Sequence, residues 1–299
     1  VGGACAAALS ALRATPVAAA PRTRPELTDG QFTELRQLIR DYCGMAFEPG
    51  KKYLLERRLG ARLEATGVRD FGDYLRLLRQ GSRGRRELEE AVDRVAVNET
   101  YFFREDYQLR ALSDEILPGL RQRGRRRLSL WSAGCSTGEE PYTLSMLLAE
   151  DSGFAGWDVR IVGSDISRQA LRAASRGRYR EGAFRATTPA RRERFFRRVD
   201  DEWEVREAVR QPVSFSRMNL FEAEPLAELG EVDILLCRNV LIYFDAPARE
   251  RVVRAFWQQL APGGWLLLGH SETLLTMSTA FELVQLRNDT VYRKPESAR

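Results

Sequence analysis

A short apolar segment that leads into a glycine-containing turn is the strongest constraint on this fold. Leu128–Ser132 is typical of a buried strand, Gly134 and Gly138 follow in the turn, and a helix is expected from about Pro141 to Glu150. Small residues in such a turn allow a ligand to approach the backbone. In open α/β sheets, ligands lie beyond the carboxyl ends of the strands. The segment therefore predicts a nucleotide-like cofactor beside the first strand of a parallel sheet.

Strand and helix patterns alternate after this segment. Further strands are expected at 158–164, 213–218, 232–238 and 265–269, helices at 167–176 and 247–260, and a closing antiparallel hairpin at 281–286 and 290–293. This alternation predicts an α/β domain over 128–294, with a mostly parallel sheet covered by helices on both faces. Residues 179–211 break the rhythm with a helix and a tight hairpin, which indicates a small inserted β-subdomain.

The preceding region has a helical pattern instead. Residues 26–98 contain four helix-period segments, and the first begins at Thr28–Gln31, which resembles a capping box. We therefore expect an N-terminal helical bundle. A linker and connecting helix at 99–127 should join it to the α/β domain, with a disordered leader at 1–25 and a short tail at 295–299.

Composition narrows the classes of function. The 299 residues suffice for about two domains, and no apolar run approaches the roughly 18 residues of a membrane span, so we expect a cytoplasmic protein without membrane insertion. The four cysteines are far apart and His270 is the only histidine, which argues against a metal site. The net charge is only +5, and although the pI is about 9.2, no interleaving of aromatic and basic residues favours nucleic-acid binding.

The turn fits two other templates. Gly134-x-Ser136-x-Gly138 could present Ser136 as a hydrolase nucleophile with His270 as its base. A hydrolase turn normally follows several strands, however, whereas here about 100 helical residues come first. A dinucleotide would place its diphosphate at the helix start, where Glu139 lies. Glu139, together with Asp165 at the end of the next strand, fits S-adenosylmethionine better, because its tail carries an ammonium and a sulfonium.

Four segments together resemble the chemotaxis-receptor glutamate methyltransferases, the CheR family. They are Asn98–Arg104, Ala133–Tyr142, Gly163–Ser167 and Cys237–Phe244. The resemblance covers about residues 26 to 294. It implies a class I methyltransferase domain with a Rossmann-like sheet, a helical N-terminal domain and a small β-subdomain. It also implies methyl transfer from S-adenosylmethionine, leaving S-adenosylhomocysteine, to glutamates on the cytoplasmic helices of chemoreceptors.

The resemblance assigns roles to particular residues. It makes Arg104 and Tyr243 the candidates for catalysis. It places cofactor contacts at Asn98, Thr100, Arg104, Ala133, Gly134, Glu139, Asp165, Asn219, Leu220, Arg238 and Asn239. A glutamate substrate is already an anion at neutral pH, so no general base is required. Arg104 and Tyr243 would instead orient the substrate carboxylate.

Substrate docking is expected on the helical domain. Lys51, Arg58 and Arg62 share one helical stripe that could lie along an acidic receptor helix. The hairpin at Arg198–Arg206 lacks the longer loop with which some family members bind a receptor-tail pentapeptide, so we expect no such tether. We expect a monomer. A methyltransferase with another substrate, or a regulatory module that only binds S-adenosylmethionine, stays open at this stage.

Overall fold

The computed structural model describes residues 25–275, 277 and 280–296, so the expected leader and the end of the tail lie outside the described residues. Its first part is a bundle of four helices: α1 (Asp29–Cys43), α2 (Lys52–Thr66), α3 (Phe71–Leu78) and α4 (Gly81–Val95). The capping box at Thr28 and Gln31 is present, and α1 ends where Gly44 adopts a left-handed φ of 81°. Leucine and aromatic side chains that recur at helical spacing form the buried core of the bundle.

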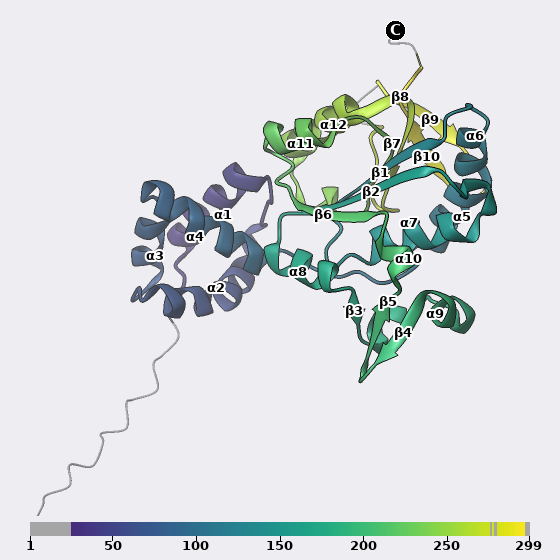
Figure 1. The fold of residues 1–299 in the computed structure, drawn as a ribbon. Helices are drawn as coiled ribbons and strands as arrows, with labels where there is room; N and C mark the ends of the chain where they lie inside the picture. The colour runs from purple at the N-terminus through teal and green to yellow at the C-terminus, as the bar shows by residue number, and fades with distance from the viewer. Residues whose placement is uncertain (1–24, 276, 278–279, 297–299) are drawn as a thin grey trace, which may run out of the picture.

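The larger part is built on a seven-stranded sheet (Figure 1). The strands, in spatial order, are β6 (Val213–Arg217), β2 (Asp158–Asp165), β1 (Arg127–Ala133), β7 (Val232–Cys237), β8 (Leu260–Leu268), β10 (Thr290–Arg293) and β9 (Glu282–Gln285). The first five strands are parallel, and β10 pairs antiparallel with both β8 and β9. This order confirms the predicted class I methyltransferase fold. The strand order reverses between β1 and β7, which is where such sheets bind ligands.

Alternating residues of the strands serve two separate cores. Leu130, Ile234 and Leu267 point to one face, and Trp131 and Leu235 point to the other. The helices that accompany the sheet are α5 (Asp106–Ala111), α6 (Leu117–Arg121), α7 (Glu139–Glu150), α8 (Arg168–Arg176), α10 (Glu207–Arg210), α11 (Ala223–Leu229) and α12 (Ala246–Gln259). The connecting helix expected within 99–127 is interrupted by a π-helical turn at Leu112–Ile116, and strand β8 begins five residues before its predicted start.

A second, three-stranded sheet projects from the larger one (Figure 1). It contains β3 (Arg178–Tyr179), β5 (Glu202–Val205) and β4 (Phe196–Val199), with α9 (Pro189–Phe195) before β4. Phe102, from the segment between the helical bundle and the sheet, is fully buried in it. The ring of Phe102 lies 4.8 Å from that of Tyr179 and 4.9 Å from that of Phe196. The connecting segment is therefore part of the core of this small sheet.

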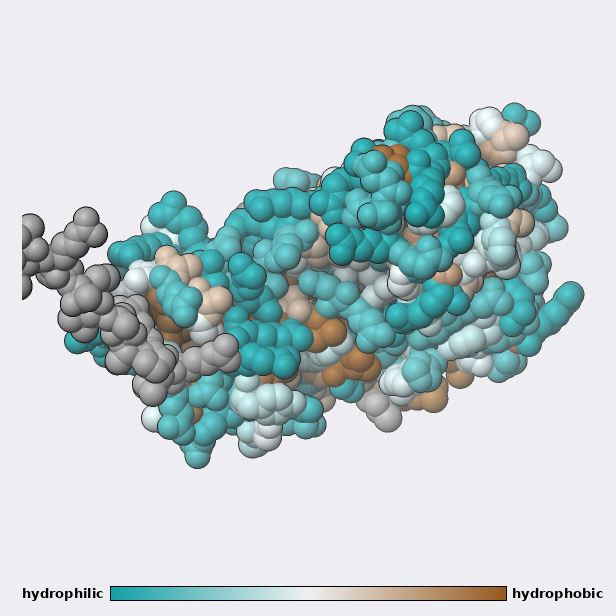
Figure 2. Space-filling view, turned by 90° about the horizontal axis from the view of Figure 1, so that it is seen from below, coloured by the Kyte–Doolittle hydropathy of each residue, from teal (hydrophilic) through white to brown (hydrophobic). Residues whose placement is uncertain are grey.

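The helical bundle contacts the sheet domain through polar groups. Arg40 of α1 pairs with Asp245 at 2.5 Å, and Arg168 of α8 pairs with Glu89 of α4 at 2.5 Å. The backbone N–H of Ala46 donates to the carbonyl of Tyr243 at 2.8 Å. Figure 2 shows a mainly hydrophilic face interrupted by small apolar spots. Among the described residues, none of the helices combines the length and the apolar character that a membrane crossing requires.

Candidate functional site

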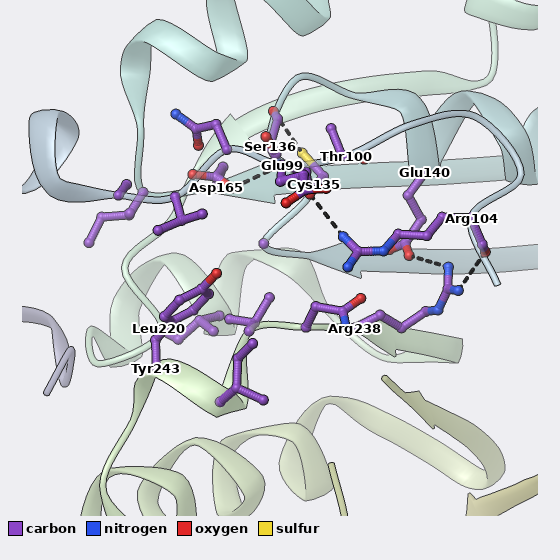
Figure 3. A pocket seen from close by; sticks show the side chains of 18 of the residues that line it. Glu99, Thr100, Arg104, Cys135, Ser136, Glu140, Asp165, Leu220, Arg238 and Tyr243 are labelled. Atoms are coloured by element: carbon purple, nitrogen blue, oxygen red, sulfur yellow. Dashed lines mark hydrogen bonds and ion pairs between the residues drawn. The ribbon is translucent and has the colours of Figure 1, made fainter. Parts of the chain in front are cut away.

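A cavity of about 300 Å³ lies at the carboxyl ends of the strands, between the sheet and the helical bundle (Figure 3). Turns after β1, β2, β6 and β7 line it, together with the end of α1 and the connecting segment. Of the predicted site residues, the lining includes Asn98, Thr100, Arg104, Gly134, Asp165, Asn219, Leu220, Arg238, Asn239 and Tyr243. Ala133 and Glu139 are absent from this lining.

The glycine turn after β1 has the close backbone approach that its sequence predicts. Gly134 adopts a φ of 78°, and a Cβ atom there would come within 2.4 Å of Val240 Cγ2. Ser136 adopts a left-handed φ of 51°, and its backbone N–H donates to Asp165 Oδ2 at 2.8 Å. The buried Ser136 Oγ has no hydrogen-bond partner among the described residues. The turn thus presents an unpaired hydroxyl at the cavity.

The hydrolase alternative finds no support in the position of the histidine. His270 Nε2 lies 2.9 Å from Ser271 Oγ, and His270 Nδ1 lies 3.4 Å from Glu105 Oε1. No contact joins His270 to Ser136, and His270 does not line the cavity. A triad requires the base within hydrogen-bond reach of its nucleophile. Ser136 lacks such a base.

Asp165 is a buried carboxylate at the end of β2. One of its oxygens accepts the N–H of Ser167 at 2.8 Å, and the other accepts the N–H of Ser136. Burial raises the pKa of Asp165, while these two backbone hydrogen bonds act in the opposite direction. Asp165 also lines the cavity, where a carboxylate can accept a hydrogen bond from a hydroxyl donor.

The two adjacent glutamates of α7 occupy different environments. Glu139 is 4% exposed and accepts a hydrogen bond from Thr137 Oγ1 at 2.7 Å, away from the cavity. Burial raises its pKa to about 7. Glu140 is the one that lines the cavity. Consecutive helical residues point about 100° apart, so the expectation that Glu139 faces the cofactor tail is corrected in favour of Glu140.

Arg238 connects several parts of the site (Figure 3). Its side chain is 3% exposed and pairs with Glu140 at 2.9 Å and with Glu105 at 3.1 Å. It also donates to Gln108 Oε1 at 2.6 Å and to the carbonyl of Arg104 at 2.6 Å. These partners occupy its guanidinium, so Arg238 fixes the geometry of its neighbours.

The connecting segment places Arg104 at the cavity. Arg104 Nη1 donates to the carbonyl of Glu99 at 2.9 Å, and its guanidinium lies 5.7 Å from the ring of Tyr101. The neighbours of Arg104 in the chain, Phe103 and Glu105, both have left-handed φ angles, of 59° and 55°. Such backbone is costly for residues other than glycine and tends to occur at functional sites.

Tyr243 faces the cavity from the turn after β7. It is partly buried, and burial is the main cause that raises the pKa of its phenol, while the charge of Arg104 acts in the opposite direction. The phenol therefore stays protonated at neutral pH and can donate a hydrogen bond. Arg104 and Tyr243 thus bring two donors to one cavity.

The side chain of Asn219 is hydrogen-bonded to backbone groups. Its Nδ2 donates to the carbonyl of Tyr42 at 2.8 Å, and its Oδ1 accepts the N–H of Phe221 at 3.1 Å. Asn219 lines the cavity while it ties the turn after β6 to α1. Leu220 presents an apolar side chain beside it.

Two residues of the predicted docking stripe have hydrogen-bond partners within the helical bundle. Arg58 donates to the carbonyl oxygens of Val95 and Ala96, at 2.7 and 3.0 Å. Arg62 pairs with Glu87 at 2.6 Å and keeps only 15% of its side chain exposed. Both arginines stabilise the packing of α2 against α4 and its end, and their role in docking stays a prediction. Lys51, in the short turn before α2, is exposed.

Family models match most of the chain. The CheR methyltransferase SAM-binding domain matches residues 98–290, and the CheR methyltransferase all-alpha domain matches residues 30–96. The chain belongs to the CheR methyltransferase family. Curated CheR relatives agree, and each is named a chemotaxis protein methyltransferase. Methyltransferase 2 of Vibrio cholerae is 35% identical over 91% of this chain and 96% of its own length.

Two further CheR relatives have similar extents. Chemotaxis protein methyltransferase 1 of Pseudomonas aeruginosa is 35% identical over 89% of this chain and 98% of its own length. The protein of Escherichia coli is 35% identical over 90% of this chain and 92% of its own length. The matches extend over both the helical and the sheet domains, so the family assignment applies to the whole described fold.

The cavity fits the S-adenosylmethionine that a CheR domain binds. Two buried polar atoms in its lining, Ser136 Oγ and Asn239 Oδ1, lack a hydrogen-bond partner in the part of the chain that the structure describes. Buried polar groups are normally paired, so these atoms have capacity for a polar ligand. Asp165 adds spare acceptor capacity beside them. Within the described residues, no cluster of three or more potential metal ligands occurs.

Some residues of the CheR site escaped the sequence prediction. Glu140 follows a predicted residue directly, and α7 begins at Glu139, two residues before its predicted start at about Pro141. Cys43 and Met45 line the cavity at the end of α1, and Glu272, which follows β8 in the chain, binds the turn after β7. Their sequence carries no local signal for these contacts, because each depends on chain segments far apart in the sequence.

Proposed function

We propose that this chain transfers a methyl group from S-adenosylmethionine to glutamate side chains on the cytoplasmic helices of chemoreceptors. The observation that carries the proposal is a single cavity that combines two unpaired polar atoms for a cofactor with Arg104 and Tyr243 for a carboxylate. Membership in the CheR family supports the reaction, and the names of the relatives support a role in chemotaxis. The product is a glutamate methyl ester.

The protein's own residues contribute binding and orientation. When bound, S-adenosylmethionine supplies an electrophilic methyl group on a sulfonium. Asp165 would accept hydrogen bonds from the ribose hydroxyls, and Ser136 and Asn239 would bind further polar atoms of the cofactor. The substrate carboxylate arrives ionised, so no group of the protein has to remove a proton. Alignment of reacting groups supplies up to roughly 7–11 kcal/mol of catalysis.

Arg104 and Tyr243 hold the attacking carboxylate. The neutral phenol of Tyr243 donates one hydrogen bond to it, and the guanidinium of Arg104 provides a positive charge. A strong grip on the anion would stabilise the ground state and slow the reaction, so their contribution is orientation. Removing one hydrogen bond to a charged group costs about 1.5–3 kcal/mol, which corresponds to a fall of about 10- to 160-fold in kcat/KM for Tyr243→Phe.

Labelled S-adenosylmethionine and receptor cytoplasmic fragments test the function. We expect base-labile label on the fragment and its loss when the receptor glutamates are replaced by alanine. Arg104→Ala should reduce the rate strongly. The matched control is Arg110→Ala, since Arg110 is exposed and forms a surface pair with Asp106. Label that resists base, or that survives glutamate replacement, would contradict the proposal.

Docking by the helical domain is assigned to exposed basic groups at the start of α2. Lys51 and Arg57 are both exposed. Charge steering by such groups acts on association with an acidic partner and is screened by salt. Arg57→Glu should raise the KM for receptor fragments several-fold while the affinity for S-adenosylmethionine stays the same. Arg83→Glu, at an exposed position of α4, serves as the control.

We further propose that the enzyme works without a receptor-tail pentapeptide. Strands β4 and β5 are joined by only Asp200 and Asp201, and Asp200 has a left-handed φ of 54° that suits a tight turn. This hairpin offers no extended loop for a peptide. Titration calorimetry with a tail pentapeptide should give no measurable heat, and micromolar binding would refute this part of the proposal.

A further inference from the structure

Glu272, after the end of β8, accepts hydrogen bonds from four backbone N–H groups. Its Oε2 accepts from Gly269 at 2.7 Å and from Asn239 at 2.8 Å. Its Oε1 accepts from Val240 at 2.9 Å and from Ile242 at 3.2 Å. Three of the four donors belong to the turn that follows β7, so one carboxylate binds the ends of two neighbouring strands together.

The backbone is shaped to receive this carboxylate. A Cβ atom on Gly269 would come within 2.7 Å of the backbone nitrogen of Asn239 and within 2.8 Å of Glu272 Oε2, so only glycine fits there. Asn239 adopts a left-handed φ of 60°, which directs its N–H to Glu272. A conformation of this kind persists where its surroundings hold it in place.

The turn that Glu272 binds contributes two groups to the cavity. Asn239 presents an unpaired Oδ1, and Tyr243 presents its phenol. The N–H of Tyr243 donates to the carbonyl of Val240 at 3.1 Å, which continues the hydrogen bonding from Glu272 toward the phenol. On its other side, the carbonyl of Tyr243 accepts from Ala46. The turn is therefore held between Glu272 and the helical domain.

We propose that Glu272 is a positioning residue for methyl transfer. It acts through the turn Asn239–Tyr243. By fixing this turn, Glu272 directs the side-chain amide of Asn239 toward the cofactor and the phenol of Tyr243 toward the substrate carboxylate. The part of this role that concerns Tyr243 rests on the proposed function. The part that concerns Asn239 needs only the binding of S-adenosylmethionine.

Glu272→Gln tests the role with little change in shape. The amide oxygen accepts from at most two of the four N–H groups, and the amide NH₂ faces the other donors. We expect S-adenosylmethionine to bind at least several-fold more weakly in calorimetry, and kcat to fall at least about tenfold at saturating substrates. The matched control is Glu282→Gln, at an exposed position of β9, which should match the wild type in both measurements.

A double-mutant cycle separates positioning from general loss of stability. If Glu272 acts through the phenol, Glu272→Gln should reduce kcat much less in a Tyr243→Phe background than in the wild type. Equal reductions in the two backgrounds, or wild-type kcat and affinity in Glu272→Gln, would overturn the proposal. Should Glu272→Gln fail to fold, Glu272→Asp keeps the charge on a shorter side chain and takes its place with the same expected outcomes.

Failure of the proposed function has a different signature. In that case the wild type forms no glutamate ester, and the affinity of Glu272→Gln for S-adenosylmethionine decides the inference. Weaker binding by a folded variant would support a positioned Asn239, and unchanged binding would overturn it. An active wild type with an equally active Glu272→Gln variant would refute the inference and leave the function intact.

Discussion

Glu139 provides a test of how burial governs stability beside the cavity. It is the first residue of α7, it is 4% exposed, and burial raises the pKa of its carboxyl from an ordinary value of 4.5 to about 7. The substitution Glu139→Gln keeps the size of the side chain and an oxygen that can accept from Thr137 Oγ1. The substitution removes the ionisable group while it leaves the packing and the hydrogen bond from Thr137 in place.

The raised pKa of Glu139 determines whether stability rises or falls with pH. The folded state binds the proton more tightly than the unfolded chain, so the wild type is most stable below the unfolded pKa. This stability is lost as the pH rises from about 4.5 to about 7. One pKa step corresponds to about 1.36 kcal/mol, so the full loss is about 3 kcal/mol. The glutamine variant does not titrate at this position and should not show that loss.

Urea unfolding of both proteins between about pH 5 and about pH 8 measures the effect. We expect the free energy of unfolding of Glu139→Gln to exceed that of the wild type by an amount that grows by about 2–3 kcal/mol across this range. Other titrating groups cancel in the difference. Glu193→Gln, at an exposed position of α9, should show a flat difference. A difference for Glu139→Gln that is constant with pH would refute the reasoning.

Three further substitutions test the geometry of the fold and the cavity. Gly134→Ala should abolish measurable binding of S-adenosylmethionine in calorimetry, because its Cβ would collide with Val240 and its φ of 78° disfavours alanine. Asn219→Ala should lower the free energy of unfolding by about 1–3 kcal/mol in urea, because it leaves the carbonyl of Tyr42 without its buried donor. Phe102→Ala should cost about 3–5 kcal/mol by the same measurement, and a loss below about 1 kcal/mol would contradict its assignment to the core of the small sheet.

Much of the fold could be predicted because its signals are local. The apolar strands and the glycine turn after Ala133 have short-range patterns, and burial on both faces of the sheet makes the strands conspicuous. The capping box at Thr28 is equally local. The π-helical turn at Leu112–Ile116 has no such pattern, and the sequence predicts one continuous helix there.

The site was harder to predict where a contact depends on the direction in which a side chain points. Helical spacing placed Arg58 and Arg62 on one stripe but could not tell that both also contact α4 or its end. Adjacent positions such as Glu139 and Glu140 differ by about a quarter of a helical turn, so a small error in the helix start exchanges their environments. Glu272 acts on a turn about thirty residues away, and only the pairing of β7 with β8 brings the two together.

The ring of Phe102 has a practical consequence for engineering this family. Within three residues the chain passes from the cavity, at Thr100, to the interior of the small sheet, at Phe102. A chimera that exchanges only residues 178–205 for those of a relative would leave this ring packed against side chains from a different protein. The exchanged sequence should therefore include the relative's own equivalent of Asn98–Arg104, so that the ring and the core that surrounds it come from the same protein.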